Sequence, residues 1–463
     1  MDFEACLNNV AEGKLPPLSM QGAPLDALFE ALPRLPDFVH KTFFFLIDEY
    51  ENFLDYQQRV VNTLIKHSGE AYTFKVGVRE LGWRCRTTLN ENEQLIHPAD
   101  YERIHIQEKL DGEPFVKLAL QVCNERIKRL RIPRKRVPNL EQLLPPLDED
   151  EEAELLDEGS GKLEAAAREL SRAVPPEDSP LLQTLTPLQK YFLLCWSQGK
   201  AMPLEQVWRQ FLDSTVEHET RYMNYKHSIL YTLRRGKRGI QKYYSGWRVF
   251  TQLAACNIRY FLELVVQSLL TALEHTGRLD KPISAKIQTL AAQAVGKKNL
   301  SELEGLSVYG GQLTKLLLGL GRVFQTMASE PLGHAPEVNQ FHLVDGDPLY
   351  SETKTGTDQP DEVECLLTSA VMHLALLRSP GSKLADETET KDYDYMIHPI
   401  FSPFFVFSHR RKRKMSLRRD QLLGLVHHPK KTIREILAAQ NRATEDPLPE
   451  QLLMFQGYYD ADS

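Results

Sequence analysis

Two adjacent carboxylates, Asp48 and Glu49, directly follow a continuous apolar run, Thr42–Ile47 (TFFFLI). If this run is a strand of an open α/β sheet, both side chains emerge at the carboxyl end of the strand, where such sheets bind their ligands. Asp48 would then hold the hydration shell of Mg²⁺, and Glu49 would polarise a water for in-line attack on a phosphate. The alternative is that the two acids only open the loop after a buried strand.

Arginines in the next part of the chain could serve the same chemistry. Arg79 and Glu80 follow a second predicted strand, Tyr72–Val78, and would therefore lie at the same edge of the sheet. Arg84 and Arg86 come in the next loop, from which an arginine can reach a γ-phosphate in the same subunit or in a neighbour. The second strand thus favours a phosphate site over a plain loop.

A further candidate arginine comes much later in the sequence. Asn257 can cap a helix, which places Arg259 in its first turn, ahead of an apolar face that includes Leu262 and Val265. A guanidinium at this place could fold back on phosphates, because its charge is permanent and its donors are forked. The alternative is a surface arginine on an amphipathic helix.

The strongest local charge is the basic segment 409–419 (HRRKRKMSLRR). It could follow a DNA backbone, which would make binding steeply dependent on salt. A solvated face, or a partner for an acidic segment, explains it equally well, and this explanation is favoured for two other basic clusters, 234–238 and 128–136. No base-reading helix can be identified. The candidate DNA-binding residues are Arg410, Arg411, Lys412, Arg413 and Lys414.

The elements that must position the two carboxylates alternate between strand and helix. The run at 42–47 is typical of a strand covered on both faces in a parallel sheet. Strand–helix alternation predicts a doubly wound α/β sheet. The predicted order is strand 42–47, helix 56–67, strand 72–78, strand 103–106 and helix 116–128.

After an α/β core at 1–137, the composition and the hydrophobic pattern of the sequence change twice and so predict three further parts. Residues 138–181 are rich in Asp, Glu and Pro and are predicted to be a solvated acidic linker. Residues 182–278 have a helical pattern and are predicted to form a lid or middle domain. Residues 279–463 combine predicted helices, a strand at 338–344, a helix at 363–377 and an apolar run with turns at 395–407, which suits a winged-helix-like domain.

Composition narrows the class of protein. The chain has 463 residues, of which 42% are hydrophobic and 26% charged, with a net charge of -7. No run is apolar enough for a membrane span and no signal peptide is evident, so we expect a cytoplasmic protein without membrane association. The six cysteines are scattered without a C-x-x-C pair, which argues against zinc or a redox dithiol.

Four segments together resemble a known family. FFFLIDEYENF, QQRVVNTLIKHS, FKVGVRELGW and HPADYERIHI are similar to the Walker B to fifth-strand portion of bacterial ATPases of the origin-recognition and replication-initiator branch of AAA+ proteins. The later NIRYFLEL resembles the sensor-2 segment of that class, and the last third resembles the winged-helix region after its lid. The resemblance implies Asp48 for magnesium, Glu49 for water, Arg79 near sensor 1 and Arg259 for sensor 2.

The sequence departs from that family at the phosphate loop. The motif G-x-x-x-x-G-K-[ST] should precede the Walker B strand, but residues 1–42 do not contain it. The partial match Gly159-Ser160-Gly161-Lys162 lies downstream, and Leu163 replaces the hydroxyl that would hold Mg²⁺. We therefore expect a partial P-loop core, whose ATP and Mg²⁺ depend on a loop supplied upstream or by a partner.

By resemblance, the chain is expected to be an ATP-dependent switch or motor acting on or near DNA, in genome maintenance or in defence against mobile DNA such as phage. It would work as a homo-oligomer or within a hetero-complex. Two alternatives remain open. One is a non-hydrolysing DNA-binding or assembly subunit that keeps the ATPase fold as a scaffold. The other is a metal-dependent nuclease that uses Asp48, Glu49 and Glu80.

Overall fold

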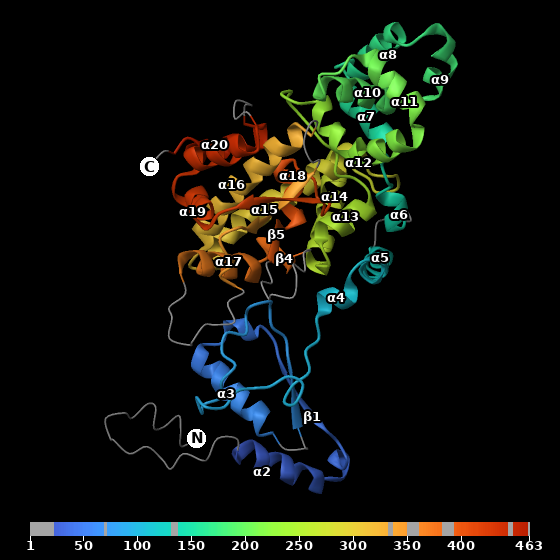
Figure 1. The fold of residues 1–463 in the computed structure, drawn as a ribbon. Helices are drawn as coiled ribbons and strands as arrows, with labels where there is room; N and C mark the ends of the chain where they lie inside the picture. Colours follow the sequence, from blue (N-terminus) through green and yellow to red (C-terminus); the bar gives the residue numbers. More distant parts are fainter. Residues whose placement is uncertain are drawn as a thin grey trace. The chain divides into compact units, whose positions relative to one another are not determined.

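The structure is a computed structural model that describes residues 23–68, 72–130, 138–331, 337–349, 361–381, 393–442 and 448–461 (Figure 1). The chain divides into two compact units, residues 1–106 and 107–463. The division falls about thirty residues before the boundary predicted at 137, because helix α5 belongs to the second unit, where it packs on α13 and α14.

The first unit is a β-α-β motif. Strand β1 (Phe43–Ile47) pairs in parallel with β2 (Tyr72–Val76), and helix α3 (Asp55–Lys66) connects them, which confirms these three predicted elements. Helix α2 (Ala23–Ala31) places Phe29 against Phe43, with ring centroids 4.8 Å apart. Short 3-10 turns span Leu32–Arg34, Pro36–Phe38 and Tyr50–Asn52.

Two predictions for this unit are wrong. The apolar run is not covered on both faces, because its side chains alternate and Phe44 and Leu46 remain 52% and 76% exposed. Residues 103–106 form no strand, since the chain runs as a loop to residue 105, with Ile104 62% exposed, and helix α4 begins at Ile106. Among the described residues the sheet of this unit therefore has two strands, and a doubly wound sheet is not formed.

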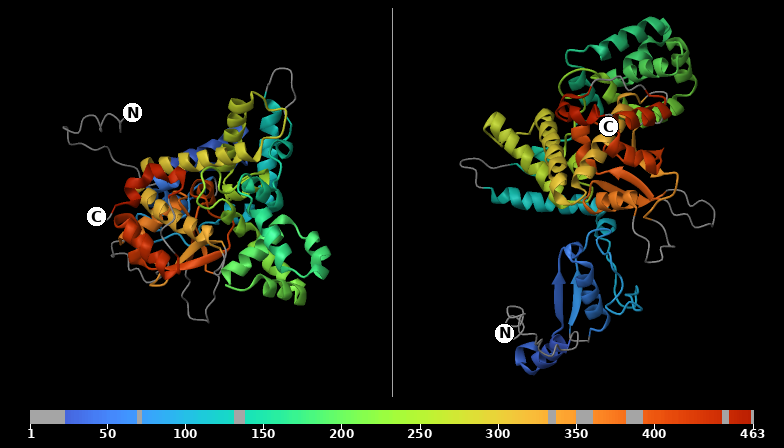
Figure 2. Two further views of the ribbon diagram at one scale, coloured as in Figure 1. Left: turned by 90° about the horizontal axis from the view of Figure 1, so that it is seen from above. Right: turned by 90° about the vertical axis from the view of Figure 1, so that its left-hand side faces the viewer.

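The N-terminal part of the second unit is helical. Helices α7, α8, α10 and α12 enclose one apolar cluster, and α8, α10 and α11 contribute to a second. Farther along, α14, α15 and α16 pack in sequence against one another (Figure 2). The helices are α4 (Ile106–Leu110), α5 (Glu113–Arg129), α6 (Leu140–Leu143), α7 (Glu149–Asp157), α8 (Lys162–Ala173), α9 (Ser179–Thr184), α10 (Pro187–Gly199), α11 (Leu204–Asp213), α12 (Thr215–Leu233), α13 (Trp247–Ala254), α14 (Ile258–Thr276), α15 (Ala285–Leu306) and α16 (Gly310–Ser329), with a 3-10 turn at Pro176–Asp178.

The segment 138–181 is not a solvated linker, which corrects the prediction for it. Asp148 caps α7 by accepting a hydrogen bond from the Glu151 amide, and the apolar side of that helix buries Leu156 completely. Glu152 is also buried, and its carboxylate lies 2.6 Å from the Lys242 ammonium. The acids of α7 therefore belong to an amphipathic helix whose inner face packs in the core. The density of acidic residues in the sequence does not distinguish such a helix from a solvated linker.

The C-terminal part contains a four-stranded mixed sheet in the order β4-β5-β3-β6. β4–β5 and β5–β3 are antiparallel, and β3–β6 is parallel. The predicted strand at 338–344 and helix at 363–377 are found, although the helix ends earlier and β4 follows it. The elements are β3 (Val338–Leu343), α17 (Glu362–Met372), β4 (Leu376–Pro380), β5 (Tyr393–Ile397), α18 (Ser402–Phe405), β6 (Arg413–Leu417), α19 (Arg419–His427), α20 (Pro429–Ala439) and α21 (Gln456–Tyr459), with 3-10 turns at Pro399–Phe401 and Glu450–Phe455.

No helix in the described part of the chain is both long and apolar enough to cross a bilayer.

The buried ion pair of α7 gives a stability prediction. Replacing Lys242 with Met should lower the free energy of unfolding by about 3 kcal/mol or more, because the buried Glu152 carboxylate loses its partner. The matched control is Arg168→Met in the pair Arg168–Glu164, whose side chains are 62% and 75% exposed and whose loss should cost at most about 1 kcal/mol. Urea denaturation measures both. Equal losses in the two variants would contradict a structural role for the buried pair.

Candidate functional site

The two candidate carboxylates lie at the carboxyl end of β1, as predicted, and both are exposed. Asp48 Oδ1 accepts a hydrogen bond from the Glu49 amide at 2.9 Å, and Glu49 Oε2 accepts one from Asn52 Nδ2 at 3.0 Å. Glu49 has a φ of 52°, so the chain turns sharply away from the strand direction here. The two carboxylates are thus held by local contacts and remain open to solvent.

The end of β2 lies beside the Asp48 carboxylate. The parallel register pairs Ile47 with Val76, and the Gly77 amide donates to the Ile47 carbonyl at 2.7 Å. A Cβ atom on Gly77 would lie 3.1 Å from Asp48 Oδ1, which is closer than side chains normally approach. Glycine at this place therefore keeps the space around the carboxylate clear.

Arg79 is held by a residue that the sequence analysis missed. Glu51, with a side chain only 6% exposed, lies 3.0 Å from Arg79 Nε and also accepts a hydrogen bond from the Arg79 amide at 3.2 Å. The guanidinium remains 47% exposed. Nothing in the sequence indicated that Glu51 would be buried, because a third acid close after Asp48 and Glu49 looks like another solvated residue.

Arg84 holds the turn that follows the two carboxylates. Its Nη1 donates to the Glu51 carbonyl at 2.7 Å, its Nη2 donates to the Phe53 carbonyl, and its Nε lies 3.0 Å from Asp55 Oδ1. The Arg84 guanidinium thus already uses the N–H donors with which it was predicted to bind a γ-phosphate. Arg86 instead lies over the ring of Trp83 and is exposed.

The two loops after the strands are joined through helix α3. Gln58 is completely buried; its Oε1 accepts from the Arg84 and Cys85 amides at 3.0 and 3.1 Å, and its Nε2 donates to the Gly82 carbonyl at 3.1 Å. One turn later, Asn62 donates to the Cys85 carbonyl at 2.8 Å. The helix thereby fixes the loop after β2.

The same helix fixes the turn after β1. The Tyr50 hydroxyl donates to the Asn62 side chain at 3.1 Å and to the Gln58 carbonyl at 3.0 Å. Burial raises the pKa of Tyr50 well above its usual value, and the neighbouring Cys85 thiol acts in the same direction, so the hydroxyl keeps its proton and stays a donor.

Arg259 lies in the second unit, at the start of α14. Asn257 caps this helix, as predicted, by accepting hydrogen bonds from the Arg259 and Tyr260 amides at 3.0 and 3.4 Å. The guanidinium is 68% exposed and lies 3.1 Å from Glu263 and 3.8 Å from Glu302. It is an exposed arginine whose charge is shared with two acids.

The basic segment is largely committed to contacts within the second unit. Arg410 lies 2.9 Å from the buried Glu337, Arg411 donates to Gln340 at 3.1 Å, and Lys414 lies 2.8 Å from the buried Asp394. Lys412 and Arg413 are exposed and form no ion pair with any described residue. Residues 131–136 of the third basic cluster lie outside the described residues.

No group of three or more His, Cys, Asp or Glu side chains gathers as a metal site within the described ranges. The role of Asp48 in holding Mg²⁺ through a bound water stays a prediction; a single exposed carboxylate is compatible with a hydrated ion. The five described cysteines are free thiols, and burial raises the pKa of Cys123 and Cys195 to about 11.

Gln58 provides a test of the arrangement. Gln58→Leu should leave the Arg84 and Cys85 amides without an acceptor, at a cost of about 2 kcal/mol, because two partly buried donors become unsatisfied. Hydrogen exchange should show faster exchange at these two amides. Gln57→Ala, which removes one hydrogen bond to the Leu54 amide on the helix surface, is the control. Unchanged protection in Gln58→Leu would contradict the role of this network.

Comparison with known proteins gives one result at the level of family. The ORC-CDC6-like family matches residues 1–417, which is most of the chain. No curated protein and no solved structure matches the chain significantly. The match spans both units, including the carboxylates after β1 and all four strands of the C-terminal sheet. The chain therefore belongs to the ORC-CDC6-like family, and is an Orc/Cdc-like relative of the AAA+ ATPases.

Proposed function

We propose that this chain is an AAA+-type ATP-dependent switch or motor that acts on or near DNA, in genome maintenance or in defence against mobile DNA. The observation that carries the proposal is the edge at which the parallel strands β1 and β2 end. It presents the exposed carboxylates of Asp48 and Glu49, with Gly77 beside Asp48. Family membership supports the ATPase part of this proposal.

Within the proposed site each described residue has a limited task. Mg-ATP would supply the metal charge and the reactive γ-phosphate. Asp48 would orient a metal-bound water, and Glu49 would accept a hydrogen bond from the attacking water. Arg79 would sense phosphate from its place on Glu51. For Arg259, at the start of α14 in the second unit, the role of a phosphate sensor stays a prediction.

The contacts of Arg84 and Arg86 indicate which of the two could bind a phosphate. Arg84 already uses its donors to hold the turn after β1. The Arg86 side chain is exposed and, within the described residues, has one ionic or ring contact, with the Trp83 ring, so it is freer to reach a phosphate in the same or a neighbouring subunit. We therefore assign Arg84 to positioning and keep Arg86 as the candidate phosphate contact.

Equilibrium binding of Mg-ATP to the 463-residue chain tests the nucleotide site. We expect Asp48→Ala to weaken binding at least tenfold, roughly the loss of one metal-orienting contact, and the exposed Asp37→Ala to leave it unchanged. Glu49→Gln should spare binding but slow hydrolysis by about a hundredfold, because the water loses its acceptor. Equal turnover in Glu49→Gln would remove Glu49 from the mechanism.

The second candidate function is a non-hydrolysing DNA-binding or assembly subunit that keeps the ATPase fold as a scaffold. This function would need no phosphate loop, and Arg84 favours it, because the donors of Arg84 already hold the turn after β1. Failure of both the wild-type chain and Asp48→Ala to bind Mg-ATP, with no rescue by a bound protein that carries such a loop, would favour this function. Rescue would favour a site completed by a partner.

For the DNA part, we propose that the C-terminal sheet belongs to a winged-helix-like domain. The antiparallel order β4-β5-β3 after helix α16, with α17 between β3 and β4, supports this. β6 lies at the edge of the sheet, where the exposed Lys412 and Arg413 can meet a phosphate backbone. Arg410 and Lys414 would then act mainly by holding the segment in place.

The division of labour within the basic segment can be measured. Replacing both Lys412 and Arg413 with Ala should weaken binding to duplex DNA and reduce the dependence of log K on log salt by about 2, since two phosphate contacts are lost. The exposed pair Lys431→Ala and Arg434→Ala on α20 is the matched control. An unchanged salt dependence would exclude this edge as the DNA contact.

A further inference from the structure

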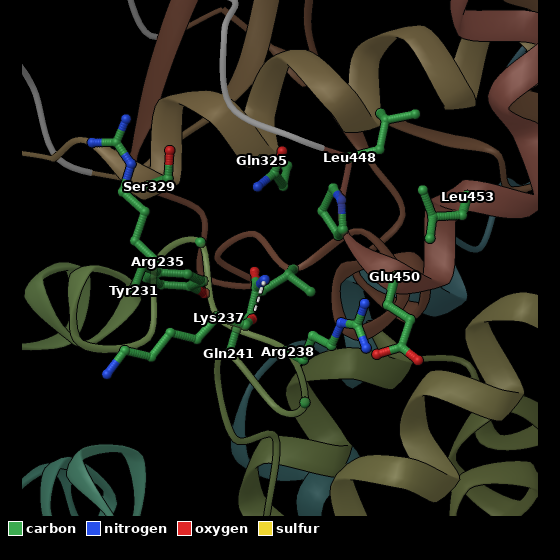
Figure 3. A pocket seen from close by; sticks show the side chains of 14 residues that line it. Tyr231, Arg235, Lys237, Arg238, Gln241, Gln325, Ser329, Leu448, Glu450 and Leu453 are labelled. Carbon is green, nitrogen blue, oxygen red and sulfur yellow. Dashed lines mark hydrogen bonds between the residues drawn. The ribbon is translucent and has the colours of Figure 1, made fainter. Parts of the chain in front are cut away.

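The turn between α12 and α13 forms one side of a cavity of about 410 Å³ within the second unit. Arg235, Lys237 and Arg238 come from this turn; in Figure 3 the side chains of Arg235 and Lys237 extend away from Leu448 and Leu453, whereas Arg238 extends toward Glu450. The last turns of α16 and the 3-10 turn Glu450–Phe455 complete the lining. The cavity belongs to neither the β1 edge nor the basic segment at β6.

The lining carries an excess of positive charge. Among the described lining residues, three basic side chains are opposed by one carboxylate, Glu450. Lys237 and Arg238 form no ion pair with any residue in the described ranges. The nearby acidic helix α7 does not neutralise them, because its described ion pairs are made with Lys226 at 3.2 Å and with Lys242 at 2.6 Å.

A second layer of charge lies directly behind the wall. Glu330 lies 2.5 Å from Arg235 and 3.4 Å from Arg442, so one carboxylate faces two guanidinium groups. The Arg442 side chain is only 2% exposed, and its Nε and Nη2 have no hydrogen-bond partner among the described residues. Arg442 and Glu330 carry opposite charges, so this second layer is neutral overall, and the excess positive charge of the cavity comes from its lining.

The turn is organised before any ligand arrives. Gly236 and Gly239 have φ values of 72° and 89°, which side chains adopt with strain. The Lys237 amide donates to the Arg234 carbonyl at 3.0 Å, and Arg234 Nη2 donates to the Arg238 carbonyl at 3.0 Å. A preformed turn reduces the entropy lost on binding.

We propose that this cavity binds a small phosphate-bearing molecule, with the phosphate at Lys237 and Arg238 and the uncharged part against the apolar wall formed by Val406, Leu448, Pro449 and Leu453. A volume of about 410 Å³ is within the usual range for small-ligand sites. Arginine and lysine together supply the forked donors and the compact charge that phosphates favour.

Calorimetric titration with inorganic pyrophosphate tests this site, in low salt and with EDTA so that no metal-dependent nucleotide site contributes. We expect saturable binding that is weakened at least tenfold by the double variant Lys237→Ala, Arg238→Ala, roughly the loss of two charged contacts. The double variant Lys286→Ala, Lys297→Ala, which removes two exposed lysines of α15, should bind as the wild-type protein does.

A variant that binds pyrophosphate more tightly would show that changes in affinity come from the site and not from misfolding. Glu450→Gln removes the one lining carboxylate and should tighten pyrophosphate binding severalfold, because the cavity becomes more positive. Asp48→Ala should leave it unchanged, so failure of the nucleotide site and failure of this site are distinguishable. No pyrophosphate binding, equal binding by the Lys237/Arg238 variant, or an effect of that variant on a DNA oligonucleotide alone would overturn the proposal.

Discussion

One buried amide side chain determines the geometry of the candidate nucleotide site. Gln58 accepts from two backbone amides of the loop after β2 and donates to the carbonyl of Gly82, while its own helix receives the Tyr50 hydroxyl from the turn after β1. A buried amide of this kind is stable only when its partners are all present. The carboxylates at the end of β1 and the arginine after β2 are therefore placed by a single helix rather than by a large sheet.

Buried polar contacts have a comparable role in the second unit. Glu337 accepts from the Ser408 hydroxyl at 2.7 Å and pairs with Arg410, and Asn339 donates to the carbonyls of Ser408 and Arg410 at 2.6 and 2.7 Å. These contacts attach the start of the basic segment to β3. Several cations of the basic segment are thus held by contacts within the second unit, whereas the side chains of Lys412 and Arg413 are exposed and form no ion pair with a described residue.

The sequence predicted those elements whose patterns are local. The apolar run before Asp48 and the periodicity of α3 were sufficient for the β-α-β unit, and Asn257 was recognisable as a helix cap from its type and position. Contacts between distant segments left no such pattern. Glu152 looked like one acid in a charged run, yet its partner Lys242 lies ninety residues away. Glu51 was likewise hidden among neighbouring acids, although its side chain is buried.

The outward face of β1 also has a thermal consequence. Phe44 and Leu46 keep about half or more of their surface in water, and Lys75 covers the Phe44 ring only in part, with its ammonium 4.6 Å from the ring centre. The tendency of apolar surfaces to adhere weakens on cooling, whereas ionic contacts change little over the same range. Solutions of this chain should consequently remain most dispersed in the cold, and warming should promote self-association through this strand before it disturbs the amide network beneath.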